Sequence, residues 1–145
     1  MPRFSANLSF LFPEVPFLER FGEAARAGFR AVEIGFAYDV PESAIADRLA
    51  EHSLQCVLIN APPGNLSAGE RGIAALAGRE DEFAKSFATA LRYAAALGCP
   101  RIHVMAGVVS GADTRAHARS SSHLPTIFRF ARSLPASWST NSRWC

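Results

Sequence analysis

The sequence predicts an α/β fold in which strands and helices alternate along the chain. Two observations support this prediction. Apolar runs of strand length follow segments whose apolar residues recur at helical spacing, and a glycine stands where two of these helices should end. With 145 residues, 49% of them hydrophobic, the chain is long enough for one domain with a real core and too short for two ordinary ones.

The first strand and helix lie within the first 28 residues. Apolar side chains alternate from Phe4 to Leu8, which predicts a strand that ends near residues 7–10. Pro16 can open a helix, because its missing N–H is not needed in the first turn. Gly28 supplies the stop after a run of helical spacing. We therefore expect a first strand–helix unit here.

The second unit and the third strand follow directly. Residues 31–36 are apolar around a single carboxylate, Glu33, and predict a buried second strand, while residues 41–52 predict a second helix. Residues 55–60 form a nearly continuous apolar run that ends at Asn60. Such a run is expected of a parallel strand that is covered on both faces.

A long connection separates the third strand from the third helix. Residues 61–78 are rich in proline and glycine, match neither a P-loop nor a dinucleotide-binding fingerprint, and predict a functional loop or lid. Residues 80–97 have the apolar periodicity of an amphipathic helix that stops at Gly98. Residues 101–105 predict the fourth strand.

Strands that alternate with helices imply parallel pairing through right-handed crossovers. Two architectures meet this requirement, a doubly wound sheet and a (β/α) barrel. Four strand–helix units would make the first half of an eight-stranded (β/α)8 TIM barrel. The sequence therefore predicts an α/β fold of about four βα units, either as an open sheet or as half a barrel.

The pattern and the composition both change after Val109. Twelve of the thirteen acidic residues lie at or before Glu82, whereas residues 110–145 contain only Asp113 against five arginines. We interpret residues 1–109 as the partial barrel and residues 110–145 as a divergent basic tail that contains Ser, Arg and Pro. The tail is either disordered or an out-of-frame translation of the gene, and reading the other frames tests the second hypothesis.

Composition narrows the class of protein. A net charge of +2, with no alternation of aromatic and basic residues in the tail, does not indicate a nucleic-acid partner. The three cysteines lack CxxC spacing, which argues against a zinc site or disulfide framework and indicates a reducing, cytoplasmic setting. The apolar residues 10–12 are cut short by Pro13, so neither a signal peptide nor a membrane span is expected.

Four polar residues fall where a (β/α) barrel keeps its functional groups, at the carboxyl ends of strands or pointing inward from them. They are Asn7, Glu33, Asn60 and His103. Glu33 is the most informative, because a carboxylate among branched apolar residues is costly to bury unless it is paired, hydrogen-bonded or placed in a polar cavity. A structural ion pair or a solvated strand end is the alternative for Glu33.

The other three also have two interpretations each. His103 could donate to a substrate hydroxyl or take part in proton transfer, but its residue type alone favours a hydrogen-bonded core histidine. Asn7 and Asn60 could donate to substrate oxygens, or they could cap the chain where a strand ends. Taken singly, the structural interpretation is favoured for each of them.

Arg79 stands between the long loop and the third helix. Its guanidinium could hold a substrate carboxylate through two parallel hydrogen bonds. The alternative is a surface ion pair with Glu80 or Asp81 at the start of the helix, and this alternative is the default.

Five separate segments, in the same order and at the same spacing over residues 3–109, resemble the hydroxypyruvate isomerase family. These segments are residues 3–9 (RFSANLS), residues 58–64 (LINAPPG), Gly69-Glu70-x-Gly72, Gly78-Arg79-Glu80, and residues 103–107 (HVMAG).

This resemblance implies the xylose isomerase-like barrel and the interconversion of hydroxypyruvate with tartronate semialdehyde through an enediol. It also implies a divalent metal, Mg or Mn, and two proton-transfer glutamates, which in the family come from the second half of the barrel. We therefore assign no catalytic or metal-ligating residue to this chain. The resemblance assigns to substrate binding Asn7, Glu33, Asn60, Arg79 and His103.

Two alternatives remain at this stage. The chain could belong to an isomerase of 2-oxo-tetronate or of another short hydroxy-keto acid, because the first half fixes the scaffold better than the substrate. It could instead be a non-catalytic half-barrel that associates with a full-length enzyme. A half-barrel also leaves its first and fourth strands with open edges, which predicts self-association through these edges.

Overall fold

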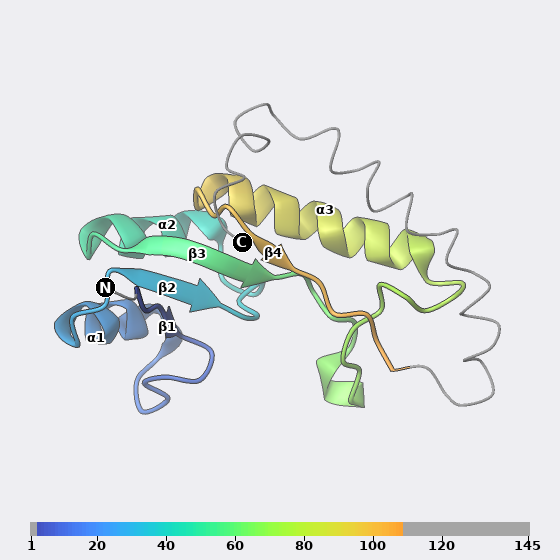
Figure 1. The fold of residues 1–145 in the computed structure, drawn as a ribbon, viewed down its shortest axis with the longest axis horizontal. Helices are drawn as coiled ribbons and strands as arrows, with labels where there is room; N and C mark the ends of the chain where they lie inside the picture. The colour runs from blue at the N-terminus through green and yellow to red at the C-terminus, as the bar shows by residue number, and fades with distance from the viewer. Residues whose placement is uncertain (1–2, 109–145) are drawn as a thin grey trace. The chain divides into compact units, whose positions relative to one another are not determined.

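Four parallel strands form one sheet in the computed structural model, which describes residues 3–108 (Figure 1). Val109 and the predicted tail, residues 110–145, with the hypotheses on it, lie outside the described residues. The strands are β1 (Ala6–Asn7), β2 (Ala31–Ile34), β3 (Gln55–Asn60) and β4 (Ile102–His103). The helices are α1 (Arg20–Arg26), α2 (Glu42–Glu51) and α3 (Glu80–Ala96), with short 3-10 turns η1 (Phe17–Glu19) and η2 (Leu66–Ala68).

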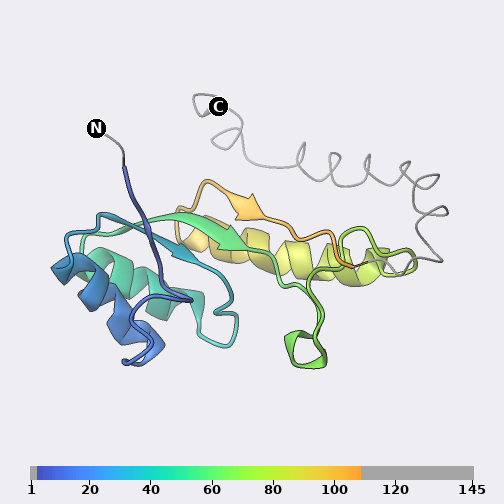
Figure 2. The ribbon, with the colours of Figure 1, turned by 60° about the horizontal axis from the view of Figure 1, so that its bottom comes forward.

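The strand order decides between the two predicted architectures. The strands lie in the order β1-β2-β3-β4 and every neighbouring pair is parallel. A doubly wound sheet reverses its order at a switch point, whereas a barrel adds each new strand at the same edge. Right-handed crossovers in one direction also place all the helices on one face, as Figure 2 shows for α1, α2 and α3. The barrel prediction is confirmed.

The core lies between this helical layer and the sheet. In β2, Val32 and Ile34 are buried while Ala31 and Glu33 are only half-buried, so one face of the strand is covered and the other is open. The sequence predicted that β3 would be covered on both faces, but Leu58, which pairs with Glu33, is also half-buried. The apolar run of β3 thus faces helices on one side and the open side of a partial barrel on the other.

A β-bulge in β3 changes the alternation of its side chains. Val32 pairs with Cys56, but the next residue, Glu33, pairs with Leu58, so Val57 is an extra residue in β3. The register is regular again from there, with Ile34 opposite Ile59.

The predicted helix stops are confirmed, and a third one has the same geometry. Gly28 and Gly98 have φ of 88° and 59°, and the residue after each glycine donates its N–H back to the helix, as in a Schellman motif. At the end of α2, Ser53 adopts φ of 53° and the N–H of Leu54 donates to the Leu49 carbonyl at 2.9 Å. A serine here has a conformation that glycine adopts more readily.

The outer strands are shorter than the sequence predicted. β1 has only two residues, and Phe4, which was expected to lie within it, is 73% exposed. β4 is also limited to two residues instead of residues 101–105. Each has only one neighbour in the described sheet, and the backbone is a strand only where that neighbour pairs with it.

The long loop, residues 61–78, is held against the chain that follows β4. Gly72 forms an antiparallel bridge with Ala106, and the N–H of Ala75 donates to the Ala106 carbonyl at 2.8 Å. The N–H of Gly72 donates to the Pro63 carbonyl at 3.0 Å. The loop predicted as a functional loop or lid is therefore tied at its middle to the chain that follows β4.

Within residues 3–108, no helix is both long enough and apolar enough to cross a bilayer.

Candidate functional site at the open face of the sheet

The register brings the four polar strand residues to one face. Asn7 pairs with Glu33, and Asn60 pairs with His103. Register partners in a parallel sheet project to the same side. Leu58, the partner of Glu33, is two residues before Asn60, so Asn60 shares this side as well. The four residues therefore form a row across the face that the helices leave open.

Glu33 is half-buried and hydrogen-bonded. Its Oε1 accepts from the hydroxyl of Ser5, the residue just before β1, at 2.6 Å. Ser5 was not among the residues that the sequence predicted for this site. The available signal was its spacing, since Ser5 stands two residues before Asn7 and should face the same side.

Asn7 uses its side-chain oxygen to turn the chain at the end of β1. Oδ1 accepts from the N–H of Ser9 at 3.0 Å, which is an Asx turn. The Ser9 hydroxyl then accepts from the N–H of Gly35 at 2.8 Å. The predicted capping role of Asn7 is thus present, and the two hydrogens of its amide nitrogen are not consumed by this turn.

Gly35 permits the ends of three strands to approach one another. A Cβ at this position would lie 2.6 Å from the Ser9 hydroxyl oxygen and 3.8 Å from Nδ2 of Asn60. A side chain would therefore separate the polar groups at the ends of β1 and β3. The lack of one at Gly35 places these groups around the same small space.

Asn60 is positioned by a pair of tyrosines. Its backbone carbonyl accepts from the Tyr38 hydroxyl at 2.5 Å, and the Tyr38 ring packs edge-on against Tyr93 with centroids 4.9 Å apart. The Tyr93 hydroxyl donates to the Val40 carbonyl at 2.9 Å. Burial, and then the nearby Tyr93, raise the pKa of Tyr38 above its ordinary value, so its hydroxyl stays a donor. Tyr38 was not among the residues predicted from the sequence.

His103 ends β4 with an exposed side chain. Its carbonyl accepts from the N–H of Ala61 at 2.8 Å, which fixes the backbone beside the end of β3. The side chain does not lie in the core, so the interpretation of His103 as a core histidine does not describe this structure. Its imidazole is accessible to a ligand at the open face.

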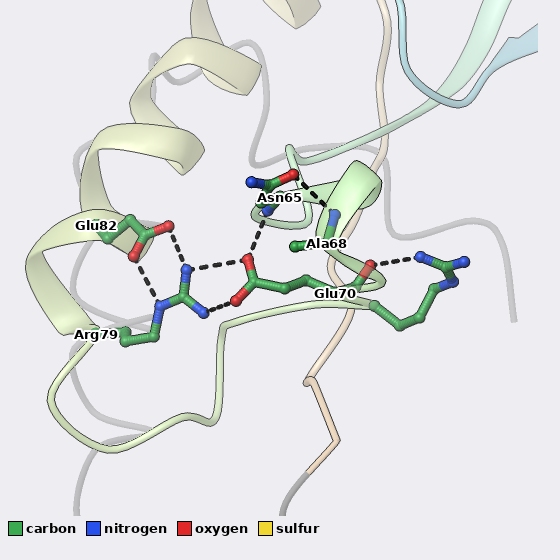
Figure 3. Close-up of polar contacts among 6 residues, drawn as sticks. Asn65, Ala68, Glu70, Arg79 and Glu82 are labelled. Carbon is green, nitrogen blue, oxygen red and sulfur yellow. Dashed lines mark hydrogen bonds and ion pairs between the residues drawn. The ribbon is translucent and has the colours of Figure 1, made fainter.

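Arg79 lies elsewhere, at the junction of the long loop and α3 (Figure 3). Its Nε and Nη2 donate to Glu82 at 2.7 and 2.6 Å, and its guanidinium also forms a two-point pair with Glu70. Glu70 in turn accepts from the N–H of Asn65, and the Asn65 side chain accepts from the N–H of Ala68. The guanidinium therefore holds the loop by joining it to the first turn of α3.

The charges of this cluster reinforce one another. The hydrogen bonds from Arg79 lower the pKa of Glu70 and that of Glu82, and the carboxylates of Glu82 and Glu70 raise the pKa of Arg79. A substrate carboxylate would have to replace one of these two partners. The geometry thus corresponds to the ion-pair alternative, with Glu70 and Glu82 as partners, and the assignment of Arg79 to substrate binding stays a prediction.

The implied divalent metal has no ligand set in this part of the chain. Among residues 3–108, no three or more His, Cys, Asp or Glu side chains are grouped so that they could hold an ion. The described residues therefore do not fit the metal, and we derive no step through it.

Parallel strands in sequential order, helices on one face and polar side chains toward the carboxyl ends on the other define this chain as part of a (β/α)-barrel protein. A family model described as a xylose isomerase-like TIM barrel matches residues 21–133. The chain belongs to this family, and the predicted resemblance is confirmed.

Named relatives make the match more specific. A 2-oxo-tetronate isomerase of Pectobacterium atrosepticum is 49% identical over 115 residues, which are 79% of this chain and 44% of that protein. A putative hydroxypyruvate isomerase of Homo sapiens is 50% identical over 113 residues, 77% of this chain and 41% of that protein. The chain thus spans less than half the length of these curated relatives.

A solved structure shares the fold. A crystal structure described as AP endonuclease, family 2, from Brucella melitensis is 55% identical, with a TM-score of 0.75, and the match covers 77% of this chain and 43% of that one.

Proposed function

We propose that this chain forms the substrate-binding wall of an isomerase that acts on a short hydroxy-keto acid, with hydroxypyruvate as the first candidate substrate and 2-oxo-tetronate as the second. The identity of about half with relatives that carry these two names is the observation that supports the proposal. The row of Asn7, Glu33, Asn60 and His103 on one open face gives the wall its chemistry.

The proposed reaction moves one proton from C3 to C2 and one from the C3 oxygen to the C2 oxygen, and it leaves the carbon chain intact. A base removes a proton from C3 of hydroxypyruvate, the electrons form an enediol, and a proton added at C2 gives tartronate semialdehyde. The two oxygens at C2 and C3 exchange the roles of carbonyl and hydroxyl in this process. Groups that can both donate to and accept from these oxygens can hold the substrate and the product as well as the enediol between them.

The four residues differ in what they can offer. The amide hydrogens of Asn7 and Asn60 suit a carbonyl or alkoxide oxygen, and the His103 imidazole can donate or accept. The Glu33 carboxylate can only accept while ionised, so it fits a substrate hydroxyl and repels the substrate carboxylate. We therefore propose that the substrate lies with a hydroxyl toward Glu33 and its carboxylate away from it.

A chimera tests this proposal. Residues 1–108 replace the matching part of the Pectobacterium atrosepticum relative, so that the wall is joined to a second half of the barrel. Proton NMR in D₂O then follows both substrates, because passage through an enediol incorporates solvent deuterium. We expect turnover of at least one substrate, and a decrease of about tenfold or more in kcat/KM for Asn60→Ala, since the loss of one hydrogen bond to the reacting oxygens costs about 1.5 kcal/mol or more.

The control for this variant is Thr89→Ala in α3, a half-buried residue whose hydroxyl donates to the Lys85 carbonyl one turn earlier in the same helix. Its activity should equal that of the parent chimera. A folded chimera with no turnover of either substrate would contradict the proposal. The 145-residue chain, assayed alone with and without Mg²⁺ or Mn²⁺, shows whether turnover requires the second half.

The description of the solved neighbour suggests a second candidate, the cleavage of DNA at abasic sites. A duplex with one abasic site, incubated with the same chimera and with the chain alone, separates the two candidates. We expect no cleavage of this duplex. Cleavage without isomerisation would favour the second candidate.

We also propose a cytoplasmic location, supported by cysteine spacing that is not typical of disulfide frameworks. Self-association through β1 and β4, the end strands of the described sheet, is a further proposal. Light scattering coupled to size exclusion checks it, and a monomer at all concentrations would rule it out.

A further inference from the structure

Two free cysteines face each other in the core. Cys56 belongs to β3 and Cys99 follows the C-terminal glycine of α3, and their exposures are 3% and 0%. Further along the same two segments, Ile59 pairs with Ile102 in the parallel register. Cys56 and Cys99 each stand three residues before these partners, and Val57 is an extra residue on the β3 side, so the two cysteines lie on neighbouring segments without being register partners.

The two side chains also interact directly. A hydrogen bond between the thiols raises the pKa of Cys56 and lowers that of Cys99. The Cys99 sulfur lies 3.3 Å from the Arg101 carbonyl oxygen, so it is held on the side of the chain that leads into β4. The pair is thus an ordered dithiol in which Cys99 is the more readily ionised member.

We propose that Cys56 and Cys99 are an oxidisable pair that forms a disulfide between β3 and the segment leading into β4. Disulfides join residues whose Cα atoms are about 4.4 to 6.8 Å apart. Neighbouring backbones of a sheet lie about 4.8 Å apart, and the two thiols of this pair interact with each other. This inference does not depend on the proposed isomerase activity.

A low-molecular-weight disulfide such as oxidised glutathione is the oxidant. The Cys99 thiolate attacks one sulfur of it, the S–S bond breaks, and one glutathione leaves as a thiolate. Cys56, after losing its proton, attacks the Cys99 sulfur of the mixed disulfide and releases the second glutathione. The protein loses two S–H bonds and gains one S–S bond, while two electrons and two protons pass to the two glutathione molecules.

The link would act on the two strands that carry half of the candidate site. Asn60 and His103 each stand four residues after a cysteine of the pair, and they are register partners. Oxidation would therefore fix the separation of β3 and β4 at one end while the two polar side chains project at the other. Because the thiols are buried, the exchange requires a local opening near β4.

The test uses the full chain with Cys145→Ser, which removes the third cysteine. The folded protein is incubated with oxidised glutathione and then digested without reduction. We expect a mass lower by two hydrogens, the loss of both free thiols, a peptide that links residues 56 and 99, a higher melting temperature, and reversal of all four by dithiothreitol.

Two controls isolate the pair. Cys56→Ser and Cys99→Ser, each made in the Cys145→Ser chain, should gain at most one glutathione and no increase in melting temperature. The proposal is overturned if the folded Cys145→Ser chain keeps both thiols under conditions that oxidise the same chain in urea. It is also overturned if oxidation yields only glutathione adducts or intermolecular dimers.

Discussion

Replacement of Gly72 by alanine should destabilise the fold far more than the same change at another glycine of the loop. A Cβ at Gly72 would lie 2.5 Å from the Met105 carbonyl carbon and 2.6 Å from the Gly107 nitrogen, and closer still to the Met105 oxygen. All three are backbone atoms, so no side-chain rotation can make room. The loop would have to move away from the chain that follows β4.

The size of the expected loss of stability follows from the backbone strain and from the hydrogen bonds that this movement breaks. The backbone of Gly72 has φ of 114°, where a residue with a Cβ is strained by about 1 to 2 kcal/mol. The bond from Ala75 to Ala106 at 2.8 Å and that from Gly72 to Pro63 at 3.0 Å would be lost or weakened, at about 1 kcal/mol each. We expect Gly72→Ala to lower the free energy of unfolding by about 3 to 4 kcal/mol.

Gly69 provides the matched control. It lies in the same loop with φ of 85°, but a Cβ there would meet no heavy atom within 4 Å. Gly69→Ala should therefore cost only the conformational strain, about 1 to 2 kcal/mol. Urea unfolding of both variants measures the difference, and hydrogen exchange at residues 72–76 should show faster exchange in Gly72→Ala alone. Equal costs for the two substitutions would refute the steric argument.

Three further changes test other parts of the fold. Ser53→Gly should raise the free energy of unfolding by about 0.5 to 1 kcal/mol, because glycine adopts the positive φ at the end of α2 without strain, and no gain in urea would contradict this. Tyr93→Phe should cost about 1 kcal/mol in the same measurement, because the Val40 carbonyl loses its donor. The lowered pKa of Glu70 means that its pairing with Arg79 is fully formed above the ordinary value of 4.5 and is lost as the pH falls through the lowered pKa. Hydrogen exchange of residues 65–70 should therefore accelerate in acid, beyond the ordinary pH dependence of exchange, and Arg79→Gln should abolish that acceleration.

The sequence predicted most accurately the elements whose own residues form a distinctive apolar pattern. The bounds of β3 at Gln55–Asn60 agree with the prediction, and α3 at Glu80–Ala96 is one residue shorter than expected. A long periodic helix and a continuous apolar run are largely decided by local residues. The ends of β1 and β4 depend instead on where a neighbouring strand pairs, and nothing within Arg3–Leu8 itself reports this.

The sequence brought forward the polar strand residues of the candidate site, whose role in substrate binding stays a prediction, but it did not indicate the residues that hold them in place. The spacing of polar residues in strands identified Asn60 and Glu33, yet their partners Tyr38 and Ser5 are 22 and 28 residues away in sequence. Only the register brings these pairs together. The link from Arg79 to Glu70 likewise spans the loop and could not be read from the neighbouring acidic residues.

The bulge in β3 determines which side of the sheet each residue of that strand faces. Cys56 and Asn60 are four residues apart, and in a strand with a strict period of two they would point to the same side. Because Val57 is an extra residue, the thiol faces the helices while the amide faces the open side. The extra residue therefore allows two groups that face opposite sides of the strand to stand four residues apart instead of three. A deletion of Val57 would keep both residues on their present sides and would straighten the strand between them. The length of β3 can therefore change by one residue at this point without turning either side chain to the other face.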